Sequence, residues 1–145
     1  MINTLPSFQK LNRINKIIDS FQSDSIQYLS KSNKLHPSLI SSFILTDNQN
    51  NDIGFINLFR LKVNRFYSNK ICYLSYGIIP EFQNKGYSKI LLNKAIEMAR
   101  ENNFKEIHYH VDRTNIKSIR AIKKFGRFQI KKEFKSKLVY FTSIE

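Results

Sequence analysis

The sequence predicts a mixed α/β fold, in which one mostly antiparallel sheet carries helices on both faces. Three observations predict it. Runs of β-forming residues are separated by polar turns, and two segments in the second half carry apolar residues at helical spacing. In addition, one strand–helix–strand order favours a right-handed parallel crossover.

The first half of the chain predicts a helix, a hairpin and a third strand. The helix has an apolar stripe made of Leu11, Ile14, Ile18 and Phe21. A shorter helix fits around 26–30. The predicted strands cover 38–46, 53–61 and 71–79. A polar turn at 48–52 joins the first two strands into a hairpin, and a basic loop over 63–70 precedes the third.

The second half alternates helices with strands. A helix over 88–102 has a stripe of Leu92, Ala95, Ile96 and Ala99, and Ser88 is its predicted N-cap. A strand over 106–112 and a helix over 116–125 follow. The segments 128–134 and 138–142 close the chain as a pair of strands. The crossover therefore runs through the helix at 88–102.

The composition favours a single packed domain over 1–145 and excludes several classes of protein. The length of 145 residues and the 41% hydrophobic content suit one core. A single Cys excludes an internal disulfide framework and a Cys-rich zinc site. Because no long apolar run or signal-like N-terminus occurs, we expect a cytoplasmic protein with no membrane partner, either a monomer or a homodimer.

The formal net charge of +13 has two readings. It reflects either a coding bias toward Lys, Asn and Ile or an anionic partner such as nucleic acid. Nucleic acid stays possible but is not favoured, because the basic residues are spread along the chain. In either case the surface repels polycations, so a polyamine-like substrate would need a local acidic pocket.

The most informative segment is 78–88 (IIPEFQNKGYS), where a strand ends and a helix begins. The first amides of a helix have no intrahelical partner and lie at the positive end of its dipole, which favours a bound pyrophosphate. Gly86 permits positive φ, and Lys85 and Lys89 add positive charge. An ordinary strand-to-helix turn is the alternative for this segment taken alone.

Three motifs in order resemble the GNAT superfamily of acyl-CoA N-acyltransferases. Gln83-x-x-Gly86-x-Ser88 is similar to its Q/R-x-x-G-x-G/A loop, and the 76–80 run YGIIP resembles the strand before that loop. The Asn115-x-x-Ser118 motif with KFG at 124–126 is closest to the ribosomal-protein N-terminal acetyltransferase branch. The resemblance covers about 53–142, and the first forty residues match only in being helical.

The chain departs from the family pattern at three positions. Ser88 replaces the last small residue of the loop motif. Arg127 follows the KFG motif where the family usually has Phe, which Phe128 replaces one position later. Ile122 stands where many members carry the Tyr that protonates the departing thiolate.

The resemblance implies an acetyl-CoA site. The sheet is expected to be splayed between its fourth and fifth strands, with a bulge at Gly77 in the strand at 71–79 and the pantetheine arm along that strand's edge. The implied cofactor-binding residues are Tyr76, Gly77, Ile78, Gln83, Asn84, Lys85, Gly86, Tyr87, Ser88, Lys89, Asn115 and Ser118. No metal is implied.

The resemblance also implies direct attack of a primary amine on the thioester, so the enzyme supplies a base and an acid. His110 stands where the N-terminal acetyltransferase branch often has a Glu base, and Ser118, water or a tyrosine such as Tyr76 would protonate the sulfur. The acceptor is a protein N-terminus or a small-molecule or sugar amine. The alternative is a non-catalytic GNAT-like module that binds CoA, nucleic acid or a protein.

Several of these residues also have purely structural interpretations. Asn115 fits the N-cap of the helix at 116–125, and Cys72 fits a buried core thiol. His108, His110 and Asp112 alternate along one strand and so share a face. Four interpretations of this face stay open: it is solvated, it is merely hydrogen-bonded, it is catalytic, or it binds a metal.

Overall fold

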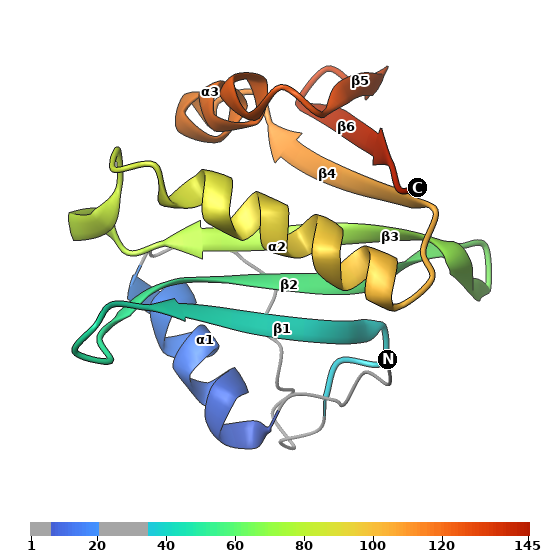
Figure 1. Cartoon of the computed structure of the whole chain (residues 1–145). Helices are drawn as coiled ribbons and strands as arrows, with labels where there is room; N and C mark the ends of the chain where they lie inside the picture. The colour runs from blue at the N-terminus through green and yellow to red at the C-terminus, as the bar shows by residue number, and fades with distance from the viewer. Residues whose placement is uncertain (1–6, 21–34) are drawn as a thin grey trace.

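The computed structural model describes residues 7–20 and 35–145, which form a six-stranded mixed sheet with helices on both faces (Figure 1). The strands are β1 (Leu39–Thr46), β2 (Asp52–Val63), β3 (Phe66–Ile78), β4 (Glu106–Asp112), β5 (Gln129–Glu133) and β6 (Lys137–Ser143). The helices are α1 (Phe8–Ser20), α2 (Tyr87–Glu101) and α3 (Ile116–Phe125), and a 3₁₀ turn, η1, spans Pro80–Phe82. The predictions for Phe21 and for a helix around 26–30 lie outside the described residues.

The order of strands across the sheet is β1-β2-β3-β4-β6-β5. Every neighbouring pair is antiparallel except β3 and β4, which are parallel and are connected by α2. The predicted mixed fold, hairpin, parallel crossover and closing strand pair are therefore confirmed. A parallel pair needs such a long connection because the chain must return to the same end of the sheet.

Two apolar cores lie on opposite faces of the sheet. The buried stripe of α2 and Ile122 of α3 pack on one face, with alternate residues of β2 such as Ile56 and Leu58. The buried stripe of α1 packs on the other face against Phe55 and Phe59. Fully burying a Leu or Ile side chain contributes about 1.5–3 kcal/mol, so the amphipathic stripes hold the helices on the sheet.

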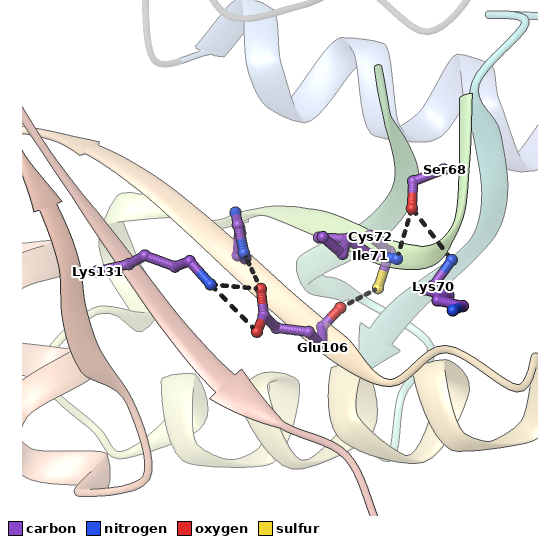
Figure 2. Close-up of polar contacts among 7 residues, drawn as sticks. Ser68, Lys70, Ile71, Cys72, Glu106 and Lys131 are labelled. Carbon is purple, nitrogen blue, oxygen red and sulfur yellow. Dashed lines mark hydrogen bonds and ion pairs between the residues drawn. The ribbon is translucent and has the colours of Figure 1, made fainter. Parts of the chain in front are cut away.

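The hairpin between β2 and β3 corrects the prediction of a basic loop over 63–70. Val63 pairs with Phe66, and the turn between them has an asparagine at φ 57°. Asparagine tolerates the left-handed region, so this segment turns within two residues. In β3 the Ser68 hydroxyl accepts hydrogen bonds from the Lys70 and Ile71 amides where the register shifts (Figure 2). The β-branched and aromatic residues of this segment favour strands, and this preference is stronger than the effect of the basic charge from which a loop was predicted.

No helix in the described ranges, 7–20 and 35–145, is both long and apolar enough to cross a bilayer.

Candidate functional site

The sheet opens between β3 and β4. Their parallel pairing covers only Ile71–Tyr73 of β3 and Glu106–His108 of β4. Beyond these residues β3 stays paired with β2, β4 stays paired with β6, and the facing edges of 74–78 and 109–112 form no ladder with each other. Figure 1 shows the two strands diverging toward the end of the sheet where α2 begins. The splay thus follows the strand predicted at 71–79. It lies between the third and fourth strands of this chain, not between the fourth and fifth as predicted.

Gly77 does not form the predicted bulge. It pairs in register with Phe55, and the irregularity in the β2–β3 ladder lies at the other end of β3. The glycine that matters for packing here is Gly54, because a Cβ on it would lie 2.4 Å from the carbonyl oxygen of Gly77. The backbones of β2 and β3 approach closely here, which explains why position 54 is a glycine. A single glycine within a strand is typical of such an approach.

Three hydroxyl groups meet at the opening on the face covered by α2 and α3. The rings of Tyr76 in β3 and Tyr109 in β4 lie 5.6 Å apart, and both side chains share hydrogen bonds with Ser118 of α3. Burial raises the pKa of both tyrosines, so their hydroxyls keep their protons at neutral pH. The opening therefore contains proton donors that do not depend on Ile122, which is fully buried in the core.

The loop after β3 has the local geometry of an anion site. Gly86 is the N-cap of α2 with φ 85°, and Asn84 has φ 62°. Within the described part of the chain the amides of Asn84, Lys85 and Gly86 donate no backbone hydrogen bond. A Cβ added to Gly86 would meet no heavy atom within 4 Å, so the space beside it is open. The first amides of α2 continue the same row of unpaired donors.

The predicted N-cap at Ser88 is wrong. The helix begins at Tyr87, and the left-handed conformation of Gly86 takes the capping position without a side-chain hydrogen bond. Ser88 lies one residue inside the first turn, half-buried. Within the described ranges the helix start has no side-chain capping hydrogen bond, so its first amides are available to a ligand.

Gln83 connects the loop to both sides of the opening. Its Nε2 donates to the Ile78 carbonyl at the end of β3, and its Oε1 accepts from Lys117 Nζ of α3, each at 3.0 Å. Lys85 stands over the Phe82 ring at 5.8 Å, and Lys89 is exposed on the first turn of α2. Both lysines lie within three residues of Gly86 in the sequence and add positive charge to this end of α2.

Asn115 caps α3 as its structural interpretation predicts. Its Oδ1 accepts from the Ser118 amide at 3.2 Å, while the Ser118 hydroxyl faces the two tyrosines. The side chain of Asn115 is exposed at the open end of the sheet. Capping and ligand contact are compatible because the cap uses the side-chain oxygen, and the Nδ2 amino group can still donate.

His110 lies on the opposite face of the sheet from Ser118. Its ring lies 6.1 Å from the Tyr73 ring and 6.3 Å from the His108 ring. Partial burial lowers the pKa of His110, and electrostatic interactions with Lys137 and His108 lower it further. The imidazole is therefore neutral at pH 7 and available as a base. The structure brings Tyr76 together with Ser118, and places His110 separately, on the α1 side of the opening.

His108 is engaged in a polar network. Its Nε2 contacts the Glu106 carboxylate, which also accepts two hydrogen bonds from Lys131 Nζ, at 3.1 and 3.3 Å. Figure 2 shows Lys131 reaching across to Glu106. Burial opposes ionisation of Glu106, but the hydrogen bonds from His108 and Lys131 outweigh it and lower its pKa. In the described residues no group of three or more potential metal ligands forms.

Cys72 is a core thiol, as predicted. It is fully buried with Leu74 in the core beneath α2, and its Sγ donates to the Glu106 carbonyl at 3.6 Å (Figure 2). Burial raises its pKa to about 12, which keeps it protonated and unreactive.

Sequence reasoning missed Tyr109 and Tyr73. Tyr109 alternates with His108 and His110 along β4, so it faces α3 and meets Tyr76. Tyr73 faces the α1 side beside His110. Strand alternation already separates the two faces, but the partner of each ring depends on where β3 and β4 part.

The described geometry agrees with comparisons to known proteins. A family model, the acetyltransferase (GNAT) family, matches residues 8–126. The match begins well before the predicted start near residue 53, so α1 and β1 belong to the family pattern as well. No curated protein matches the sequence.

Solved structures share the fold at low sequence identity. The acetyltransferase of GNAT family from Streptococcus pneumoniae has a TM-score of 0.71 at 16% identity, covering 99% of both chains. The spermidine N-acetyltransferase from Vibrio cholerae, solved with CoA and spermine, has a TM-score of 0.67 at 20% identity, covering 94% of this chain and 89% of that one. AAC(6')-Ib, solved with ribostamycin and coenzyme A, has a TM-score of 0.60 at 14% identity, covering 73% and 64%.

Proposed function

Because this chain belongs to the acetyltransferase (GNAT) family, we propose that it transfers an acetyl group from acetyl-CoA to a primary amine. The observation that carries the proposal is the opening between β3 and β4. It ends at a loop in which, among the described residues, the amides of Asn84, Lys85 and Gly86 donate no backbone hydrogen bond. We propose a single cytoplasmic domain that acts by direct attack in a ternary complex.

In the proposed complex, the pyrophosphate of acetyl-CoA accepts hydrogen bonds from the loop amides of 84–89. The pantetheine arm extends along the free edge of β3 at Tyr76, Gly77 and Ile78. Two features support this placement: the open space beside Gly86 and the positive charges of Lys85 and Lys89. Gln83 holds the loop to the end of β3, and Asn115 and Ser118 flank the arm from α3.

The proposed chemistry needs one base and one acid. The amine nitrogen forms a bond to the acetyl carbonyl carbon, the carbon–sulfur bond breaks, and the thiolate takes up a proton. His110 accepts the proton from the amine, directly or through water, because its lowered pKa keeps it neutral. Tyr76, hydrogen-bonded to Ser118, donates the proton to sulfur in place of the tyrosine that Ile122 replaces.

The acceptor amine belongs to a protein N-terminus or to a small molecule or sugar. The first alternative follows the resemblance of Asn115, Ser118 and the KFG run to the ribosomal-protein N-terminal acetyltransferase branch. Spermine, which is present in the Vibrio cholerae structure, is a poorer model for this chain, because a net charge of +13 repels polycations.

The second candidate is a binding module without turnover. Ile122 favours it, since this side chain donates no proton and is fully buried. The paired hydroxyls of Tyr76 and Tyr109 favour catalysis, because they lie at the opening and keep their protons.

One experiment distinguishes the two candidates. Acetyl-CoA is incubated with a panel containing a peptide N-terminus, an amino sugar and a simple alkyl amine. Release of the CoA thiol is compared with the mass of the acetylated product. The enzyme proposal predicts equal amounts of thiol and N-acetyl product for at least one amine. Thiol release no faster than hydrolysis, together with RNA binding that weakens steeply with salt, would support the binding module.

A further inference from the structure

A pocket of about 220 Å³ lies on the α1 side of the sheet, over β4, β5 and β6. His108 and His110 line it from β4, and lysine side chains from β5 and β6 form much of its remaining wall, together with apolar groups such as Phe134. The side chain of His110 faces this pocket while its neighbours Tyr109 and Val111 face the opposite core. The proposed base is thus part of the pocket wall.

The pairing of the strands places a cationic side chain at a short distance from His110. His110 pairs with Val139 of β6, and Val139 pairs with Lys132 of β5. Paired residues point to the same face, and neighbouring strands lie about 4.8 Å apart, so the backbones at His110 and Lys132 are separated by about 10 Å. A small acceptor therefore spans from the base to the ammonium of Lys132.

A register shift brings a second lysine to the same wall. The β5–β6 ladder skips one residue between Ile130 and Lys132, which leaves Lys131 as the extra residue of a bulge. As a result two consecutive lysines both line the pocket, although regular alternation would direct one of them to the other face. Lys137 of β6 also lines the pocket. It lies two residues before Val139, which is the strand partner of His110.

The charges in the pocket do not cancel. Lys131 is neutralised by Glu106, which also contacts His108. Within the described ranges neither Lys132 nor Lys137 forms an ion pair with a carboxylate, and Lys137 stands over the Phe134 ring at 5.2 Å. No carboxylate lines the pocket itself. The carboxylates next to the lining residues have other partners. Glu106 is paired with His108 and Lys131, and Asp112, which pairs with Lys137 across the strands, accepts hydrogen bonds from Thr114. The side chains that line the pocket are therefore net positive.

Resting on the acetyltransferase activity proposed above, we propose that this pocket selects an acceptor whose primary amine is joined by a short chain to a carboxylate or phosphate. The anionic group lies between Lys132 and Lys137, and the amine lies at His110. Electrostatic attraction favours such an acceptor over an amine of equal length that has no anionic group, and repulsion disfavours a polyamine.

The test compares four acceptors: 1-aminobutane, 4-aminobutanoate, O-phosphoethanolamine and spermidine. At low salt we expect kcat/KM for the better of the two anionic amines to exceed that for 1-aminobutane by about tenfold, falling below about threefold in 0.5 M NaCl. Spermidine is expected to be the poorest. The ratio of kcat/KM for the two anionic amines shows whether the pocket prefers a carboxylate or a phosphate. The inference is overturned if 1-aminobutane or spermidine equals the better anionic amine.

Charge reversal at Lys132 supplies the structural control. Lys132→Glu should abolish the anionic preference, whereas Lys105→Gln, a change of an exposed lysine between α2 and β4, should preserve it. An unchanged preference in Lys132→Glu contradicts the assignment. If no amine is acetylated, the proposed function fails separately, and the pocket is tested by binding. 4-Aminobutanoate should then perturb the His110 imidazole NMR signals in the wild type and not in Lys132→Glu, and absence of perturbation in the wild type overturns the inference.

Discussion

Substitutions at Gly86 can test two properties of the loop separately. One is its backbone conformation, and the other is the open space that a phosphate would occupy. The φ of 85° at Gly86 is in the left-handed region, and no heavy atom lies within 4 Å of a Cβ built on it. Gly86→Ala should therefore lose stability without a clash, by about 1–2 kcal/mol for the left-handed conformation. For a chain of this length such a loss lowers Tm by about 3–6 °C.

Gly86→Asn should cost less stability, because asparagine adopts this conformation readily, as Asn84 does with φ 62°. Both substitutions nevertheless add a side chain to the open space. If one charge-assisted hydrogen bond to the pyrophosphate is lost, the affinity for acetyl-CoA falls by about 2 kcal/mol, or about 30-fold.

The assay is calorimetric titration of acetyl-CoA into each folded variant, with Tm measured in parallel. Gly126→Asn is the matched control, since Gly126 has φ 82° at the C-terminal end of α3. It should keep wild-type affinity. A folded Gly86→Asn variant that binds acetyl-CoA as tightly as the wild type would refute the placement of the pyrophosphate on this loop.

Three further predictions concern the acid, the base and the cap. Ser118→Ala and Tyr76→Phe should each lower kcat with little change in the KM for acetyl-CoA, by about 10²-fold for Tyr76→Phe; an unaffected kcat in steady-state assays would assign the acid elsewhere. Because burial lowers the pKa of His110, protonation of its imidazole should reduce kcat/KM only below about pH 6.5, in addition to the pH dependence that the acceptor amine itself contributes. His110→Gln should lose this acidic limb in the pH profile and about 10²-fold of kcat/KM at pH 7, whereas a retained limb would assign it to another group. Asn115→Ala should lower the free energy of unfolding by about 1 kcal/mol in urea titrations, since the amide of Ser118 loses its acceptor, and no loss would show that the cap is dispensable.

Local pattern was sufficient to predict most of the fold. The stripe on α2 and the alternation along β4 depend on residues close in sequence, and both are confirmed in the buried cores. The β2–β3 hairpin was mistaken for a loop because its charge was weighted above Val63, Phe66 and Tyr67, which extend the two strands. The prediction of Ser88 as the N-cap failed for a different reason. The left-handed Gly86 takes the capping position two residues earlier, so the helix has already begun before Ser88.

The site was predictable only in part, because it depends on where two distant strands separate. The loop motif around Gly86 is continuous in sequence, so it could be found without a structure. The cluster of Tyr76, Tyr109 and Ser118 comes from two strands and a helix, and it exists only because β3 and β4 stop pairing after Tyr73. The bulge that brings Lys131 beside Lys132 likewise depends on the register of β5 against β6.

The central claim, that the opening between β3 and β4 holds acetyl-CoA, is tested most directly by amide hydrogen exchange. Exchange is measured for the whole chain with and without saturating acetyl-CoA. The account predicts slower exchange at 76–78 on the free edge of β3 and at 84–89 in the loop, with no change in α1. Unchanged exchange at both segments, under conditions where calorimetry shows acetyl-CoA bound, would contradict it.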